Sequence, residues 1–456
     1  MWTAALLIAC SGGGNPDTPT DGTATPPPVV DDGNLHDALS MPQVPTHDPA
    51  SFRSAKTCQT CHPDHYGEWR TSMHAYAMVD PVFQALVRLR QVDLAGTEDQ
   101  FCLQCHTAIG TRGGEIVSGF SFEELSDITM EAITCESCHK VSGMQRDYNS
   151  GHVLDPDGPI RGPYVSEMVN PFHESVQSDL FESSEFCGGC HDVIESSGLD
   201  LERPYREWQE SPAAAEEQSC QDCHMPIIRR PSVWNGAERD SRSHRFVGVD
   251  VPLVDGWVTP EEEAEIRAGT EALLATAAGI TLQAPTEVSP GETFDVTVTV
   301  LNKIPAHNLP TGSTFIRQLW VELTARDADG NVLFVTGDLD ANGDLRDQWS
   351  ELDRYGDHDL ISLGSSLVDA SGNPVLFSWN ASEHNSNALS PLYDRTATLF
   401  VPTAADTATP ITVEARLRFR ALPPYLLRAL GLGDKVGAVT VHDLATDTAE
   451  VALGAP

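Results

Sequence analysis

The chain has 456 residues and carries 67 acidic against 28 basic side chains, which gives a formal net charge of -39. This excess of negative charge keeps a protein soluble and excludes nucleic acid and anionic lipid as electrostatic partners. The length suffices for two or three domains with more than one core.

The first nine residues are predicted to be a signal peptide for export. Residues 2–9 form an apolar run that is too short to span a bilayer. Because no Lys or Arg precedes this run, we expect residues 1–9 to be a truncated signal. Leu7-Ile8-Ala9-Cys10 resembles the lipobox of bacterial lipoproteins, whose cysteine is lipidated, so Cys10 is the expected lipid site. An unmodified cysteine in a discarded signal is the alternative. Residues 10–50 are rich in Gly, Pro, Thr and Asp and are expected to be a disordered linker.

One motif recurs five times between residues 51 and 257: two cysteines three positions apart, followed at once by a histidine. The copies begin at Cys58, Cys102, Cys135, Cys187 and Cys220. Together they use ten of the eleven cysteines. Disulfides in an exported protein and zinc ribbons also use paired cysteines, but neither explains a histidine after every pair.

A covalently bound haem accounts for the whole motif. The two thiols add to the vinyl groups of a porphyrin, and the adjacent histidine binds the iron. We therefore predict five c-type haems, attached as thioethers by Cys58, Cys61, Cys102, Cys105, Cys135, Cys138, Cys187, Cys190, Cys220 and Cys223. The predicted proximal iron ligands are His62, His106, His139, His191 and His224. A pentahaem domain over residues 51–257 is expected to be mainly helical or irregular, because porphyrins replace side chains in its core.

Two helices are predicted near the first motif. One runs from about residue 66 to 79, and Asp80 and Pro81 supply the N-cap and first-turn proline of the next. The first helix contains the pattern YxEWxxS over residues 66–72, and the pattern returns over residues 205–211. Aromatic packing against a haem face and packing in an ordinary core explain this repeat equally well.

The second half of the chain changes from helical to strand periodicity. Residues 258–280 predict one connecting helix with Thr259 as its cap. Over residues 281–420 apolar and polar side chains alternate, which predicts an immunoglobulin-like β-sandwich. Residues 421–456 are expected to form a C-terminal tail that packs on this β-domain. The predicted fold class is therefore α + β, with several domains.

Each haem iron has a second axial position, and its occupant decides the chemistry. A second histidine closes the site for electron transfer, whereas an open position admits a substrate. The candidate distal ligands are His74, His152, His173, His244 and His307. His65 follows His62 on one helical face and cannot reach across its own haem. His358, His384 and His442 are expected to be solvated in or beyond loops of the β-domain.

The motifs together resemble the multihaem c-type cytochromes related to the tetrahaem cytochrome of ammonia oxidisers. The similarity covers about residues 51–450 and is carried by CxxCHxxxYxxWxxSxH, "SEFCGGCHDV", "YREWQES", "CQDCHMP", "HRFVG" and "AHNLPTGSTFIRQLWVELTARDADGNVLF". It implies a packed haem array with mostly bis-histidine ligation, which carries electrons outside the cytoplasm. It also implies that His74, His244 and His307 are distal ligands. Ala306 stands where the family pattern GHxxPTG has its first glycine.

The sequence therefore predicts an exported cytochrome, lipid-anchored to the outer membrane and facing the periplasm or the cell exterior. It is expected to carry electrons rather than to catalyse a reaction. One alternative is an oxidoreductase acting on nitrite or hydroxylamine, although the CxxCK site of pentahaem nitrite reductases is absent. Another is a filament-forming or partner-binding cytochrome, which would be a homo-oligomer. The expected partners are other cytochromes or a basic-surfaced donor, and no nucleic acid.

Overall fold

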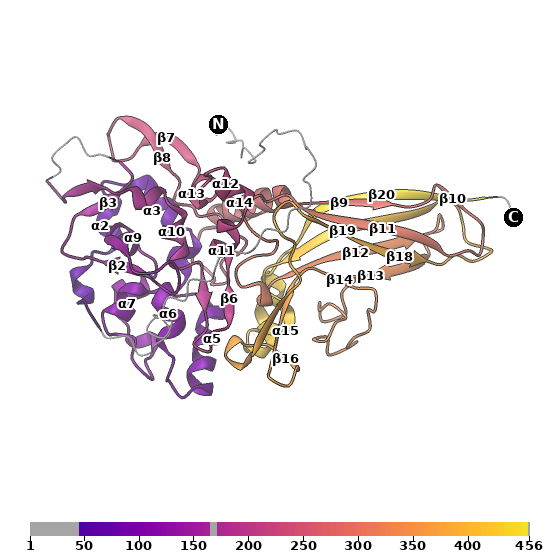
Figure 1. Cartoon of the computed structure of the whole chain (residues 1–456), viewed down its shortest axis with the longest axis horizontal. Coiled ribbons are helices and arrows are strands. Elements are labelled where there is room, and N and C mark those ends of the chain that lie inside the picture. Colours follow the sequence, from indigo (N-terminus) through magenta and orange to yellow (C-terminus); the bar gives the residue numbers. More distant parts are fainter. Residues whose placement is uncertain (1–44, 165–170, 455–456) are drawn as a thin grey trace.

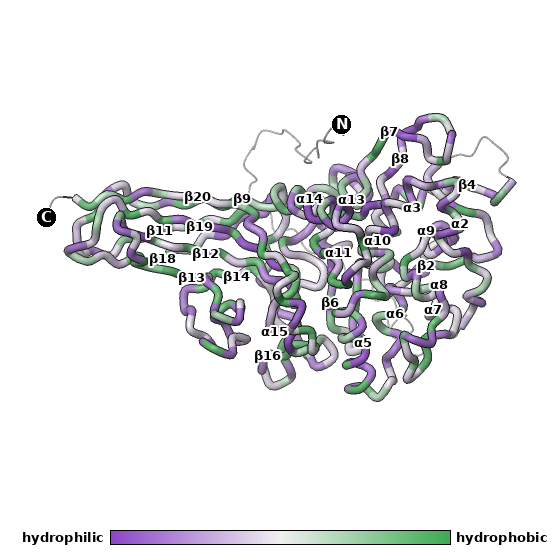
Figure 2. Tube along the Cα trace, turned by 180° about the vertical axis from the view of Figure 1, so that it is seen from behind, coloured by the Kyte–Doolittle hydropathy of each residue, from purple (hydrophilic) through white to green (hydrophobic). Residues whose placement is uncertain are grey.

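The computed structural model describes residues 45–164 and 171–454. The predicted signal over residues 1–9, the predicted lipid site at Cys10 and most of the predicted linker lie outside these residues. Figure 1 shows two halves along the long axis, with short helices and hairpins in the first and long strands in the second. No helix of the described chain is long and apolar enough to cross a membrane. Figure 2 shows hydrophilic and hydrophobic residues mixed along the described trace.

The first half is built from short elements. Its α-helices are α2 (Ala55–Gln59), α3 (Pro63–Arg70), α4 (Met73–Tyr76), α5 (Pro81–Asp93), α6 (Gln100–His106), α7 (Ala108–Arg112), α8 (Asp127–Met130), α9 (Cys135–His139), α10 (Ser184–Gly188), α11 (Pro204–Gln209), α12 (Pro212–Ala215) and α13 (Cys220–His224). Its 3-10 turns are η1 (Pro49–Ser51), η2 (Phe122–Glu124) and η3 (Asp179–Glu182). Its strands form the pairs β1 (Val141–Met144) with β2 (His152–Leu154), β3 (Ile160–Gly162) with β4 (Ser175–Gln177), β5 (Val193–Ile194) with β6 (Asp200–Glu202), and β7 (Ile227–Pro231) with β8 (Glu238–Arg242). Isolated two-stranded pairs are marginal in water, so these need contacts with other groups.

The apolar core of this half is divided among small clusters. One surrounds Met78, Leu103 and Ile116, another contains Ile109, and a third contains Trp69. This division is what we expect of a domain in which bound porphyrins supply part of the core.

The helix predicted over about residues 66–79 is instead two helices, α3 and α4, separated at Thr71 and Ser72. Ser72 has extended backbone angles, and its hydroxyl donates to the carbonyl of Trp69 at 2.7 Å. A serine that bonds to nearby backbone competes with continuation of the helix. In α5, Asp80 accepts a hydrogen bond from the Val82 N–H at 3.0 Å, and Pro81 occupies the first turn.

Asp80 is also expected to make stability depend on pH. Burial raises the pKa of its carboxyl from 3.8 to about 6. The folded state therefore binds this proton more tightly than the unfolded state, so the stabilisation is complete below pH 3.8 and is lost as the pH rises through 6. Asp80→Asn keeps a cap acceptor and should flatten the dependence of Tm on pH between about 4 and 6. Thermal melts of both proteins measure this, and an unchanged profile would contradict it.

The second half begins with α14 (Pro260–Ala277), whose first turn is closed by a capping box between Thr259 and Glu262. The main strands are β9 (Ala278–Gln283), β10 (Glu287–Val288), β11 (Phe294–Asn302), β12 (Gln318–Arg326), β13 (Val332–Thr336), β14 (Ile361–Ser362), β18 (Asp394–Val401), β19 (Ile411–Arg420) and β20 (Val441–Leu453). A small separate sheet contains β15 (Ser365–Val368), β16 (Pro374–Val375) and β17 (Glu383–Ser386). The remaining elements are α15 (Pro424–Ala429), η4 (Thr314–Ile316), η5 (Ser378–Asn380) and η6 (Gly433–Ala438).

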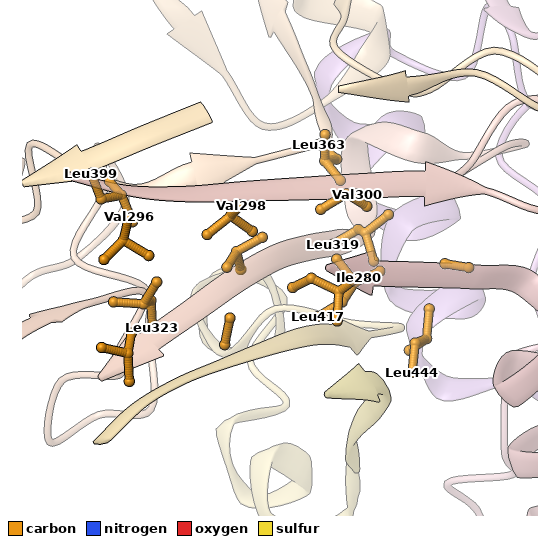
Figure 3. Close-up of a cluster of buried hydrophobic side chains, with 14 of the residues drawn as sticks. Ile280, Val296, Val298, Val300, Leu319, Leu323, Leu363, Leu399, Leu417 and Leu444 are labelled. Carbon is orange, nitrogen blue, oxygen red and sulfur yellow. The ribbon is translucent and has the colours of Figure 1, made fainter. Parts of the chain in front are cut away.

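Two sheets of this half share one apolar core. The larger has the strand order β10-β20-β19-β12-β13, with β14 also paired to β12, and the smaller has the order β18-β11-β9. Along β19, Ile411, Val413 and Ala415 are buried and alternate with exposed residues, as the period of a strand requires. Figure 3 shows Val298 of β11 and Leu323 of β12 within the same cluster. Two sheets therefore contribute to one core, and the immunoglobulin-like sandwich stays a prediction.

The last segment of the chain is part of the larger sheet. β20 pairs antiparallel with β19 along its length. Leu427 of α15 is fully buried in a cluster with Val82 and Leu253 from the first half. The domain boundary predicted at residue 420 thus lies between β19 and β20, which pair in one sheet.

Candidate functional site

The five CxxCH motifs all begin in helices, namely α2, α6, α9, α10 and α13. In the second, third and fifth motifs both cysteines lie within the helix, where residues three apart are on the same side, so the two thiols point the same way. In the first and fourth motifs the helix ends before the second cysteine. The His62 N–H donates to the Cys58 carbonyl at 2.8 Å, and the His191 N–H donates to the Cys187 carbonyl at 2.9 Å. Each motif therefore presents two thiols and one imidazole together, as covalent attachment of a haem requires.

The cysteine and histidine side chains of the motifs fit a haem site better than they fit disulfides or a zinc site. The ten cysteines in the described ranges form no disulfide with one another. Within those ranges no group of three or more His, Cys, Asp or Glu side chains could hold a metal ion. A structural zinc ion needs four protein ligands, whereas a haem iron already has four porphyrin nitrogens and needs only one or two.

Four of the five proximal histidines face another histidine. The ring centroids are 6.4 Å apart for His62 and His173, 6.3 Å for His191 and His74, 6.3 Å for His139 and His244, and 6.4 Å for His224 and His307. An imidazole nitrogen lies about 2 Å from a bound transition metal, so two rings on opposite sides of one iron have centroids about 6 Å apart. All four pairs have the separation that an iron between them requires.

Backbone carbonyls orient these rings. The Nδ1 atom lies 2.6 Å from the Ser232 carbonyl oxygen in His62, and 2.5 Å from the Arg161 carbonyl oxygen in His139. In His307 it lies 2.9 Å from its neighbour's carbonyl oxygen. A proton on Nδ1 that is donated in this way leaves the Nε2 lone pair free to bind a metal.

Burial favours the neutral imidazole that metal binding needs. It lowers the pKa of His74 and of His106 to about 4, and that of His244 to about 3. In each case the loss of hydration is the largest cause, and neighbouring histidines lower the pKa further.

The second motif differs from the other four. The His106 ring stacks on Phe83 at a centroid distance of 4.0 Å and an angle of 4°, and its buried Nδ1 has no hydrogen-bond partner among the described residues. Among the described ring contacts, none places a histidine opposite His106. Within the described ring contacts, this motif therefore has a lone histidine where each of the others has a facing pair.

His152 is the predicted distal ligand that the structure does not bring to a proximal histidine. Its Nε2 lies 2.8 Å from the Phe186 carbonyl oxygen, and its Nδ1 lies 3.7 Å from the Cys190 sulfur. Both ring nitrogens therefore have partners, and this geometry does not support the prediction.

The two glycines of the fourth motif allow other side chains to approach the motif closely. A Cβ atom on Gly189 would lie 2.5 Å from His152, and a Cβ atom on Gly188 would lie 2.6 Å from Tyr205.

Different motifs also contact each other. Thiol pairs close enough to hydrogen-bond are Cys58 with Cys135, Cys105 with Cys190, and Cys187 with Cys220. The first motif therefore neighbours the third, the second neighbours the fourth, and the fourth neighbours the fifth. Sequence reasoning did not find these neighbours, nor Phe83, which no motif marks.

Comparisons with known proteins support a multihaem c-type cytochrome. A family model described as cytochrome c554 and c-prime matches residues 57–140. The crystal structure of a penta-heme cytochrome c552 from Thermochromatium tepidum matches with a TM-score of 0.61 and 19% identity, over 88% of this chain and 100% of that chain. At this identity the match shows a shared fold.

Other comparisons add little. The CARDB domain of a Pyrococcus furiosus protein covers 39% of this chain and 87% of its own at 10% identity, but its TM-score of 0.18 carries no argument. No curated protein sequence matches the chain. The family model and the five CxxCH motifs together support placing this protein among the multihaem c-type cytochromes.

Proposed function

We propose that this protein is an exported electron carrier with five c-type haems. Four haems have two histidine ligands each, and the haem attached at Cys102 and Cys105 has His106 alone. The observation that carries the proposal is the set of four histidine pairs at 6.3 to 6.4 Å. The cytochrome c554 family match over residues 57–140 supports it independently.

The chain's own residues would hold and separate the redox centres. When bound, each haem supplies an iron that gains and loses one electron. The thioether cysteines fix one edge of each porphyrin, and the paired histidines exclude water and other ligands from four irons. The adjacent cysteines of different motifs would place their porphyrins next to one another. Electrons could then pass between the first and third sites, and among the second, fourth and fifth.

Location and partners follow from the sequence. We propose that Cys10 carries a lipid that anchors the protein to the outer membrane, facing the periplasm or the cell exterior. The net charge of -39 favours a basic-surfaced electron donor, and other cytochromes are the second class of partner.

A second function is favoured by the lone histidine of the second motif. An iron with one protein ligand has an open position where a small molecule could bind. The oxidoreductase alternative, acting on nitrite or hydroxylamine, would use the site at His106 and pass electrons to the fourth motif beside it.

Spectroscopy of the purified protein tests the proposal. Mass spectrometry should find the mass of five covalent haems, and electron paramagnetic resonance should find four low-spin ferric irons and one high-spin iron. The reduced protein should bind carbon monoxide at one iron only. A chain without added haem mass, or five low-spin irons, would contradict the proposal.

A further inference from the structure

The two YxEWxxS segments make the same contacts in different parts of the first half. The first, residues 66–72, lies mostly in α3 and follows the first motif. The second, residues 205–211, lies mostly in α11 and follows the fourth motif. Their matching tyrosine, tryptophan and glutamate residues can therefore be compared as independent copies.

The tyrosine backbone attaches each segment to the motif before it. The Tyr66 N–H donates to the His62 carbonyl at 3.0 Å, and the Tyr205 N–H donates to the His191 carbonyl at 3.3 Å. In both copies the acceptor is the proximal histidine of the preceding motif. The segment therefore starts from the same place relative to a CxxCH motif each time.

The tryptophan side chain attaches each segment to another motif. Trp69 Nε1 donates to the Ile133 carbonyl at 2.7 Å, and Trp208 Nε1 donates to the Gln218 carbonyl at 2.8 Å. Both acceptors lie two positions before the first cysteine of a motif, the third in one case and the fifth in the other. The indole N–H thus holds the start of a helix that carries a proximal histidine.

The glutamate side chain holds the loop that carries the histidine on the other side of that same site. Glu68 accepts the N–H of His244 at 2.8 Å, and His244 faces the proximal histidine of the third motif. Glu207 accepts the N–H of Asn308 at 3.0 Å and the hydroxyl of Thr311 at 2.6 Å. Asn308 directly follows His307, which faces the proximal histidine of the fifth motif.

Burial makes these contacts costly to lose in the first copy. Glu68 is 6% exposed and forms two hydrogen bonds of 2.7 Å with Arg230. A buried carboxylate is stabilised only while such partners remain. Its position, and with it the position of His244, is therefore well defined.

We infer that YxEWxxS is a duplicated positioning device, in which the tryptophan places the proximal histidine and the glutamate places the distal histidine of one haem. The first copy serves the site of His139 and His244, and the second serves the site of His224 and His307. The inference rests on the proposed haem ligation. An ordinary core helix would bury the aromatic rings but would not reproduce three polar contacts at equivalent positions of two motifs.

The second copy offers the cleaner experiment, because among the described residues no ion pair joins Glu207 to an arginine, whereas Glu68 is paired with Arg230. Glu207→Ala should retain five covalent haems but weaken distal binding by His307 about tenfold or more, as loss of a ligand's hydrogen-bonded support usually does. One additional iron should then become high-spin and bind carbon monoxide when reduced. Glu207→Gln keeps an acceptor oxygen and should resemble the wild type. Glu210→Ala removes an exposed glutamate of the same segment and serves as the matched control.

The outcomes separate this inference from the proposed function. A wild-type protein without five haems would contradict the proposed function. If the wild type has five haems but Glu207→Ala has the same spectrum as Glu210→Ala, the inference alone is overturned. The inference is also overturned if Glu207→Gln gains the same high-spin iron as Glu207→Ala. If Glu207→Ala does not accumulate, Trp208→Phe keeps a smaller aromatic ring and removes the N–H. It should also yield one additional carbon monoxide site, and an unchanged number of sites would overturn the inference.

Discussion

Replacing His307 by alanine is expected to leave five covalent haems and to convert one low-spin iron to high spin. His307 faces His224 at 6.4 Å, so its loss leaves that iron with one protein ligand. The covalent attachment does not depend on His307, because the thioethers are formed by Cys220 and Cys223. Mass spectrometry counts the haems, and electron paramagnetic resonance counts the high-spin irons. Under the proposed ligation their number rises from one to two.

His358 provides the matched control for this variant. It lies in the same half of the chain as His307 but is exposed, and among the described residues no histidine ring stacks on it. His358→Ala should keep the wild-type spectrum. If His307→Ala also keeps it, His307 is not a ligand.

Replacing Arg90 by alanine is expected to cost about 3–5 kcal/mol of unfolding free energy, because it leaves a buried carboxylate without its partner. Arg90 is 3% exposed and Glu195 is 2% exposed, and they form two hydrogen bonds of 3.0 and 2.9 Å. Glu195 also accepts the hydroxyl of Ser378, and the Arg90 guanidinium lies 5.5 Å from the ring centroid of Trp379. The ion pair thus connects α5 with η5 of the second half. Denaturant unfolding followed by far-ultraviolet circular dichroism measures the cost.

Arg88 on the same helix is the control for Arg90. Its ion pair with Glu123 at 2.8 Å is exposed, with 46% and 71% of the two side chains accessible. An exposed pair of this kind contributes about 0–1 kcal/mol. Equal losses for Arg88→Ala and Arg90→Ala would show that burial of the pair does not matter.

The chemistry of the site was predictable from the sequence, but its spatial pairing was not. The five CxxCH motifs are local, because the two thiols and the imidazole of each lie within five consecutive residues. The histidine pairs depend on tertiary structure: His74 follows the first motif but faces His191 of the fourth. His152 shows the same limit, since nothing in its neighbouring sequence reveals that Phe186 and Cys190 occupy its ring nitrogens.

The fold was predictable where apolar residues recur with one constant spacing over many residues. β19 alternates buried and more exposed side chains from Ile411 to Phe419, and α14 has a capping box at its start, so both are recognisable from the sequence. The break between α3 and α4 depends on one hydroxyl, that of Ser72, which bonds to the backbone instead of extending the helix. The role of β20 as a strand paired along β19 depends on its partner, which the sequence pattern does not identify.

The position of His307 has a consequence for the order of assembly. His307 is held by Asn302, the last residue of β11, whose side chain also bonds to the carbonyls of Leu389 and Ser390. Under the proposed ligation, haem attachment at the fifth motif would require only its own cysteines, whereas completion of that iron's coordination would also require β11 and the segment of Leu389 and Ser390 to come together. The spectrum of this site would then report whether the β-half has folded.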